Sequence, residues 1–216
     1  TFNEKIQWLK LYWRPNYITH LVDKINVRKF VEKKIGDEYL NTLYGTYNSY
    51  NDFFNEIGSF PNRYVIKANH GSGWNIIINE RKRFNPLEHR NLIDKWLNLN
   101  YYNIGREWVY KNIKPRILVE KYIEGSDYTV ALMNGKVLGI LEIIPNKSFY
   151  NFSAKYNSKE TVYRYPKKTS PEIINRIIKY AKLANKVLKC TGITRVDFRV
   201  NLKGEEDIYV LEINTQ

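Results

Sequence analysis

Residues 194–216 read TRVDFRVNLKGEEDIYVLEINTQ, two apolar runs separated by a polar segment with Gly204 near its middle. This pattern is typical of a β-hairpin. Side chains alternate between the two faces of a strand, so Val196, Phe198 and Val200 are expected on one face. Arg195, Asp197 and Arg199 are then expected on the opposite face. The second strand is expected to place Tyr209, Leu211 and Ile213 on one face and Val210, Glu212 and Asn214 on the other.

The polar face of this hairpin is a candidate metal site. If the hairpin closes symmetrically around Gly204 and Glu205, Asp197 lies opposite Glu212 and Arg195 lies opposite Asn214. Two carboxylates at cross-strand distance, about 4.5–5.5 Å between Cβ atoms, destabilise a sheet unless a cation lies between them. Oxygen ligands alone suit Mg²⁺ or Mn²⁺ rather than zinc. A hairpin with one solvated polar face is the ordinary alternative, and the spacing by itself favours it.

Length and composition limit the class of protein. The 216 residues, 43% of them hydrophobic, can bury a core as one compact unit or as two closely joined lobes. There is no apolar run long enough to span a membrane, and the start, TFNEKIQWLK, does not read as a signal peptide. A single cysteine, Cys190, excludes an internal disulfide and fits a reducing cytoplasm. We therefore expect a cytoplasmic protein.

The net charge of +13, with 18 Tyr and 5 Trp, predicts an anionic partner. Nucleic acid, a nucleotide or other small anion, and an acidic glycan or lipid surface all fit this charge. The basic residues are dispersed, and neither an RNA-recognition signature nor a paired-cysteine zinc module is present. Sequence-specific nucleic-acid binding is therefore not expected.

Periodicity predicts a mixture of helices and antiparallel strands, hence the α+β class. Helices are expected at 3–13, 20–34, 47–57 and 86–102, and a long one opening at Ser170-Pro171, where Ser caps the helix and Pro occupies its first turn. Strands are expected at 64–68, 74–78, 116–123, 128–133 and 136–144, followed by the terminal hairpin.

Two internal stretches could contact an anionic ligand. In YVIKANHGSGWNII a strand delivers Lys67 to a Gly-Ser-Gly turn whose backbone N–H groups can approach a phosphate. In RILVEKYIEGSDYTV a strongly apolar strand ends at Glu120 and Lys121, and Asp127 follows a Gly turn. Each stretch by itself is more often an ordinary turn, and Lys155 in FYNFSAKY is by itself more often a solvated lysine.

In order, these signals resemble the ATP-grasp superfamily. Residues 116–215 resemble the central and C-terminal part of D-alanine–D-alanine ligases, through VEKYIEGSDYTVAL, LEIIP, FYNFSAKY, RVDFRV and YVLEINT. Residues 1–121 resemble the ATP-grasp proteins of bacterial surface-polysaccharide synthesis, of the teichuronopeptide type. That similarity rests on KIQWLKLY, LVDKINVRKFV, IGDEYL, VIKANHGSGWNI and NYYNIGREWVYKNIKPRILVEKY.

The resemblance implies two α+β lobes whose antiparallel sheets clasp a nucleotide. It implies an N-terminal helical segment at 1–60, a first lobe at 61–121 with the glycine-rich loop, and a second lobe at 122–216 with the metal-binding hairpin.

The resemblance also implies ATP and Mg²⁺ (or Mn²⁺) as cofactors. Lys67 and the loop of His70, Gly71, Ser72 and Gly73 would contact the phosphates, with Lys24 and Arg28 as further candidates for the nucleotide edge. Glu120, Lys121 and Ile123 would line the adenine, with Asp127 on the ribose and Lys155 on the γ-phosphate. Asp197, Glu212 and Asn214 would hold metal, and Arg195 would steady the acyl-phosphate or the tetrahedral intermediate.

The implied activity is ATP-dependent ligation of a carboxylate donor to an amine acceptor, glycan-linked substrates included, through an acyl-phosphate. Cell-wall or surface-polysaccharide synthesis is the expected setting. Two alternatives remain: a non-catalytic or truncated ATP-binding module, and a basic binding protein for an anionic polymer.

Overall fold

A computed structural model describes residues 1–144, 161–201 and 207–215. The chain divides into two compact units, Thr1–Tyr122 and Ile123–Gln216. The predicted segments 1–60 and 61–121 both fall in the first unit. Within the described residues, no helix is long and apolar enough to cross a membrane.

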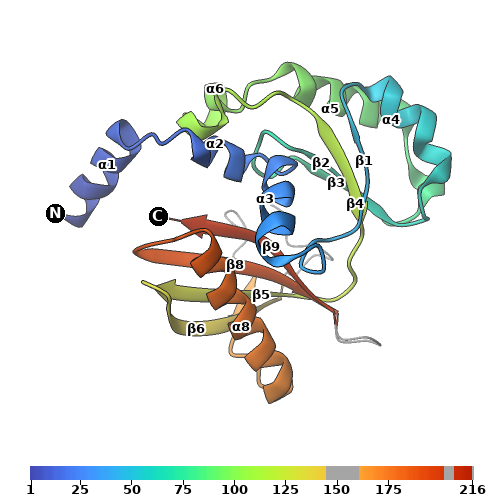
Figure 1. The fold of residues 1–216 in the computed structure, drawn as a ribbon. Helices are drawn as coiled ribbons and strands as arrows, with labels where there is room; N and C mark the ends of the chain where they lie inside the picture. The colour runs from blue at the N-terminus through green and yellow to red at the C-terminus, as the bar shows by residue number, and fades with distance from the viewer. Residues whose placement is uncertain (145–160, 202–206, 216) are drawn as a thin grey trace. The chain divides into compact units, whose positions relative to one another are not determined.

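The first unit is a four-stranded antiparallel sheet with helices, in the sheet order β1-β4-β2-β3 (Figure 1). Its strands are β1 (Leu43–Tyr47), β2 (Tyr64–Ala68), β3 (Asn75–Ile78) and β4 (Ile117–Lys121). Its helices are α1 (Phe2–Tyr12), α2 (Tyr17–Val22), α3 (Asn26–Ile35), α4 (Tyr50–Glu56), α5 (Pro86–Asn98) and α6 (Tyr102–Gly105). Short 3₁₀ turns are η1 (Ile57–Ser59), η2 (Arg81–Arg83) and η3 (Trp108–Tyr110).

Strand alternation gives this sheet one core face and one polar face. Tyr64, Ile66 and Ala68 of β2 join Ile117 and Val119 of β4 in a fully buried aromatic and aliphatic cluster. The intervening residues of the same strands project to the other face. That second face therefore carries Lys67 of β2 and Glu120 of β4.

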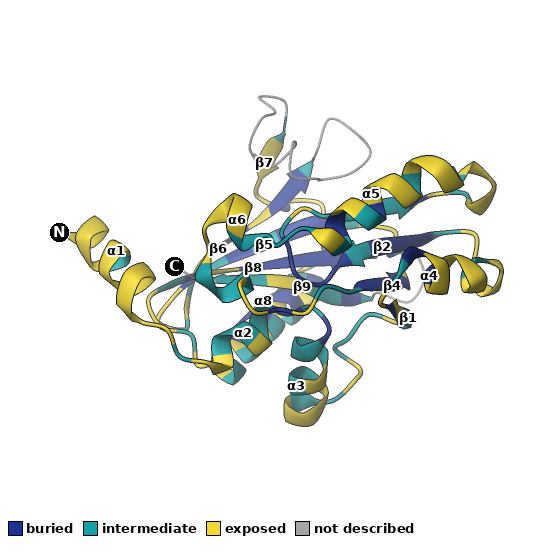
Figure 2. Ribbon diagram, turned by 90° about the horizontal axis from the view of Figure 1, so that it is seen from above, coloured by how far each residue is buried: buried dark blue, intermediate teal, exposed yellow. Residues whose placement is uncertain are grey.

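The second unit is a five-stranded antiparallel sheet in the order β7-β6-β5-β8-β9, packed against α8. Its elements are β5 (Ser126–Met133), β6 (Lys136–Ile144), β7 (Val162–Arg164), α8 (Pro171–Val187), β8 (Ile193–Val200) and β9 (Ile208–Thr215). Ser170 caps α8 by accepting a hydrogen bond from the backbone of Ile173, and Pro171 lies in its first turn, as predicted. Figure 2 shows β2, β4 and β8 mostly buried, whereas α1 is exposed.

The terminal hairpin has the predicted pairing at its polar end. Asp197 is the register partner of Glu212, and Arg195 is the partner of Asn214. The register then shifts by one residue, because Phe198 pairs with Val210 and Leu211 has no partner in the register. Val210 and Ile213 both pack on the core, while Leu211 is exposed. The predicted alternation, which placed Leu211 with Ile213 and Val210 with Glu212, is therefore wrong.

Other departures from the sequence prediction are local. The helix predicted at 20–34 is two helices, because Asp23 leaves the helical path and its carboxylate accepts hydrogen bonds from Ile25 N and Asn69 Nδ2. Strand β1 was not predicted, and α4 begins only at Tyr50. Helix α5 ends at Asn98 rather than at residue 102.

Candidate active site

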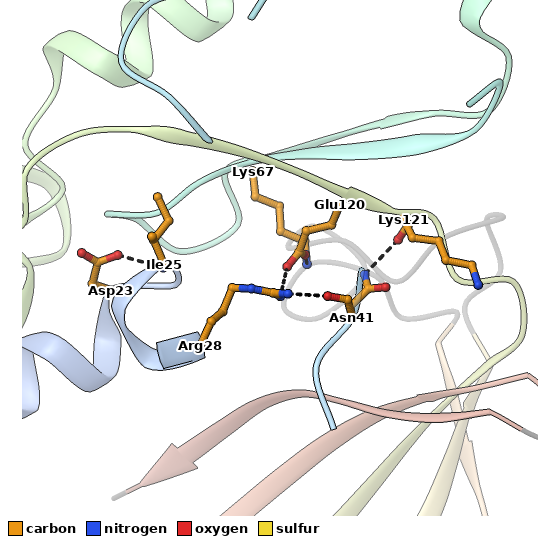
Figure 3. A network of polar contacts seen from close by, with 7 residues as sticks. All are labelled: Asp23, Ile25, Arg28, Asn41, Lys67, Glu120 and Lys121. Atoms are coloured by element: carbon orange, nitrogen blue, oxygen red, sulfur yellow. Dashed lines mark hydrogen bonds and ion pairs between the residues drawn. The ribbon is translucent and has the colours of Figure 1, made fainter. Parts of the chain in front are cut away.

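In the first unit, the carboxylate of Glu120 is held between two cations. Arg28 Nη1 lies 2.8 Å from Glu120 Oε1, and Lys67 Nζ lies 2.6 Å from Glu120 Oε2 (Figure 3). The Glu120 side chain is only 7% exposed, whereas that of Lys67 is 26% exposed. A buried carboxylate needs such partners, because removing a charge from water is costly unless it is paired. Lys67 thus keeps an accessible ammonium group in a fixed position.

Strand pairing and one helix explain this arrangement. Val65 of β2 is the register partner of Glu120 on β4, so Lys67 and Glu120 are diagonal neighbours on the same face. Arg28 reaches them from α3 and also donates a hydrogen bond to the backbone carbonyl of Asn41. Asn41 Nδ2 in turn donates to the carbonyl of Lys121 at 2.9 Å, which ties the segment before β1 to the end of β4.

The glycine-rich loop is anchored to the junction between α2 and α3. Lys24 Nζ donates a hydrogen bond to the carbonyl of Gly71, and the backbone N–H of Lys24 donates to Asn69 O at 3.3 Å. Asn69 Nδ2 donates to Asp23 Oδ1 at 3.0 Å. Two segments about fifty positions apart therefore meet, and Lys24 lies beside the loop that follows Lys67.

Within this loop, exposure increases along the chain. Gly71 is buried, and a Cβ atom there would lie 2.6 Å from the Trp74 ring, so a larger residue would displace the indole. Ser72 is partly exposed and Gly73 is exposed, with a φ of +71° that favours glycine. The Ser72–Gly73 end is thus the accessible part of the predicted phosphate loop.

The His70 side chain lies on the core side of the loop. It is 1% exposed, its Nε2 donates to the carbonyl of Trp96 at 2.9 Å, and its Nδ1 lies 3.0 Å from Asn69 Oδ1. The side chain therefore supports the loop from the core side, and the contact of this loop with phosphates stays a prediction.

His70 is expected to make stability pH-dependent. Burial lowers its pKa, and Lys24 acts in the same direction, while the Trp96 carbonyl and Asp23 act in the opposite one. Because the folded pKa is below the unfolded value of about 6.5, the unfolded chain takes up this proton first. Stability should therefore fall as pH decreases from about 7 towards 5. Urea unfolding at several pH values measures the free energy of unfolding against pH. This free energy should fall less steeply below about pH 7 in His70→Gln than in the wild type, and an equal pH dependence in the two proteins would contradict this.

In the second unit, the carboxylate of Asp197 is the centre of the polar hairpin face. Arg195 approaches it with two nitrogens, Nε at 3.0 Å from Oδ1 and Nη2 at 3.1 Å from Oδ2. Thr129 Oγ1 donates to Oδ1 at 2.7 Å, and Asn214 Nδ2 donates to Oδ2 at 3.2 Å. Glu212 is the cross-strand partner of Asp197 and is exposed.

These residues fit a hard divalent cation. Asp197, Glu212 and Asn214 carry oxygen donors, and the register places the two carboxylates directly opposite each other. No cluster of three or more His, Cys, Asp or Glu side chains with metal-binding geometry occurs among the described residues. A site here therefore depends on the two carboxylates plus the Asn214 amide oxygen.

A second ion pair lies on the same face, at the start of β5. Arg199 Nη1 lies 3.0 Å from Asp127 Oδ2, and Arg199 Nε donates to the carbonyl of Ile123 at 3.1 Å. Both side chains of the pair are nearly buried. Gly125 makes this turn possible, because its φ is +140° and a Cβ there would lie 1.9 Å from the Val200 carbonyl oxygen. Arg199 thus joins two predicted nucleotide contacts, Ile123 and Asp127.

The structure leaves the roles predicted for Lys155 and Lys121 untested. Lys155 lies outside the described residues. The Lys121 side chain is exposed, and its backbone groups bond to the segment before β1. The sequence reasoning did not assign Arg199 or Thr129 to the site. Arg199 shares the polar face with Asp197 in the alternating pattern, and that signal could have identified it.

Comparison with known proteins decides the family. The family model described as D-ala D-ala ligase C-terminus matches residues 109–216, half of the chain. The chain belongs to this family. Its resemblance to the D-alanine–D-alanine ligase C-terminus, read from the sequence, is confirmed, whereas the similarity of residues 1–121 to teichuronopeptide-type proteins stays a prediction.

One relative of this chain is the D-alanine–D-alanine ligase of Anaeromyxobacter sp. (strain K). It is 38% identical over 99 residues, which are 46% of this chain and 32% of that protein. The chain therefore spans about a third of the length of that curated relative.

Solved structures confirm the predicted ATP-grasp fold. The L-amino acid ligase from Bacillus licheniformis matches with a TM-score of 0.61 and 19% identity, over 93% of this chain and 44% of that one. The D-alanine–D-alanine ligase from Bacillus anthracis complexed with ATP matches with a TM-score of 0.56 and 22% identity, over 90% and 54%. At these identities the likeness shows the fold alone.

Proposed function

We propose that this chain carries the nucleotide- and metal-binding part of an ATP-dependent carboxylate–amine ligase that forms an amide, ADP and phosphate. The observation that carries the proposal is the pairing of Asp197 with Glu212 in register, in a chain that belongs to the D-ala D-ala ligase C-terminus family. Facing carboxylates on one sheet face are unfavourable without a cation, and ADP-forming ligation needs one.

Each residue has a distinct part in this proposal. Lys67, fixed by Glu120, would contact the nucleotide phosphates together with the Ser72–Gly73 backbone and Lys24. Lys121, Ile123 and Asp127 would bind the base and ribose, and Lys155 the γ-phosphate. Asp197, Glu212 and Asn214 would hold Mg²⁺ or Mn²⁺, which when bound neutralises charge on the phosphates. Arg195 would face the acyl-phosphate.

The chemistry is a phosphoryl transfer followed by an acyl transfer. The donor carboxylate attacks the γ-phosphorus of ATP, ADP leaves, and the amine displaces phosphate from the acyl-phosphate. Such reactions are accelerated mainly by positioning and by neutralising charge. In this proposal the ion pair with Glu120 would fix Lys67, and the ion pair with Arg199 would fix Asp127, each for its own contact with the nucleotide.

For the donor and the acceptor we propose only a chemical class. A carboxylate donor and an amine acceptor, glycan-linked ones included, fit a basic protein and a role in cell-wall or surface-polysaccharide synthesis. A cytoplasmic location would supply ATP and suit the single cysteine.

The test is to trap the acyl-phosphate with hydroxylamine. Incubation with ATP, Mg²⁺ and a panel of carboxylates is expected to yield a hydroxamate and ADP with at least one donor. The carboxylate-free reaction is the control. ATP-dependent thermal stabilisation without hydroxamate for any donor would instead indicate a non-catalytic ATP-binding module. An absence of any response to ATP would favour the polymer-binding alternative.

A further inference from the structure

The guanidinium of Arg195 neutralises Asp197 in the place that a divalent metal ion would take. Its two nitrogens contact the two carboxylate oxygens at 3.0 and 3.1 Å, the paired geometry in which arginine binds carboxylates most specifically. The Asp197 side chain is 8% exposed, whereas that of Arg195 is 45% exposed. A half-exposed cation thus covers a buried anion from the solvent side.

The remaining contacts of Asp197 also occupy its oxygens. A carboxylate offers about four lone-pair positions. Thr129 and Asn214 donate to Oδ1 and Oδ2, in addition to the two contacts of Arg195. Asn214 presents its amide nitrogen to Asp197, so its oxygen is not directed at the same point. A divalent cation shared by Asp197, Glu212 and Asn214 therefore requires Arg195 to withdraw and the Asn214 amide to turn.

We propose that Arg195 and the divalent cation compete for Asp197, so that cation binding releases the guanidinium for use on an anionic substrate group. This inference rests on the proposed function, because it concerns the same metal site. Arg195 would then have two successive partners, first Asp197 and then the anionic substrate group. A dication would replace a monocation at the buried carboxylate, and the released guanidinium is already partly exposed to solvent.

A comparison of arginine with lysine at this position tests the competition. Lysine keeps the positive charge but cannot make the paired contact. In Mn²⁺ titrations without ATP, followed by electron paramagnetic resonance of the free ion, Arg195→Lys is expected to bind Mn²⁺ about fivefold more tightly than the wild type. Arg195→Gln should bind Mn²⁺ at least as tightly as Arg195→Lys, because it also removes the positive charge that repels the ion.

A matched control exists in the same unit. Arg164 pairs with Glu142 at 3.0 Å, and its side chain is 46% exposed, closely similar to Arg195. Arg164→Lys should leave Mn²⁺ affinity unchanged. Circular dichroism of each variant confirms folding before the titrations.

The outcomes separate this inference from the proposed function. Tighter Mn²⁺ binding in Arg195→Lys but not in Arg164→Lys supports competition. Equal affinity in the wild type and Arg195→Lys overturns competition while the metal site stands. Absence of Mn²⁺ binding in every variant overturns both the metal site and the inference.

Discussion

Replacing Glu212 by glutamine is expected to abolish the Mg²⁺-dependent part of ATP binding. The substitution keeps size and shape but removes one of the two facing carboxylates of the hairpin. Without it, a divalent cation has one charged ligand, Asp197, which Arg195 already neutralises. In the wild type, Mg²⁺-ATP at about 100 times its Kd should stabilise the protein by about 2.7 kcal/mol. Thermal unfolding of Glu212→Gln should show little of this increment.

The control for this prediction is another exposed glutamate of the same unit. Glu172 lies in the first turn of α8, far along the chain from the hairpin. Glu172→Gln should retain the full Mg²⁺-ATP increment. A wild type that gains no stability from Mg²⁺-ATP, or a Glu212→Gln variant that gains as much, would return the hairpin to a solvated polar face.

Replacing Glu120 by glutamine is expected to lower the free energy of unfolding by about 2–4 kcal/mol. The variant leaves Lys67 and Arg28 without their shared carboxylate, and breaking a buried ion pair usually costs about 3–5 kcal/mol. The lower range reflects the partial exposure of Lys67. Urea unfolding measures the loss.

Glu80→Gln is a matched control for this loss. Glu80 also lies between two cations, Lys82 at 3.1 Å and Arg83 at 2.9 Å, but those side chains are 81% and 74% exposed. Surface pairs of this kind contribute about 0–1 kcal/mol, so the variant should lose little. Equal losses for Glu80→Gln and Glu120→Gln would show that Glu120 is no more than a surface ion-pair partner.

Lys67→Met should behave differently from Glu120→Gln. Glu120 would still pair with Arg28, so the stability loss should be smaller than in Glu120→Gln. ATP affinity should fall by at least about tenfold, because a charged hydrogen bond contributes about 1.5–3 kcal/mol. Unchanged ATP affinity in Lys67→Met would remove Lys67 from the nucleotide site.

The sequence was most informative where the determinants are local. The cap of α8 by Ser170 and strand β6 at 136–144 follow from turn chemistry and short-range alternation. The pairing of Asp197 with Glu212 was also predicted, but the strands next to the turn pair one residue away from the assumed register, and the bulge at Leu211 restores the predicted pair. Each of these features uses residues close together along the chain.

The sequence was least informative where distant residues decide the structure. The break before α3 combines a local contact of Asp23 with Ile25 N and a distant one with Asn69, which binds Asp23 from 46 positions away. Glu120 receives Arg28 from 92 positions away, and no periodicity in either segment indicates that contact. The local sequence predicts His70 to be an ordinary loop residue. In the structure it is buried, and its Nε2 donates to the carbonyl of Trp96, a residue distant in the sequence. Long-range packing, rather than local propensity, determines these positions.

The unpaired Leu211 has a consequence for how relatives are aligned. On either side of it, Val210 and Ile213 both face the core, while Glu212 is paired on the polar face. If residue 211 is removed, the remaining residues alternate regularly, and every core and site residue keeps its observed face. A one-residue gap at this position is therefore compatible with an intact carboxylate pair. A gap one position later would delete Glu212 itself.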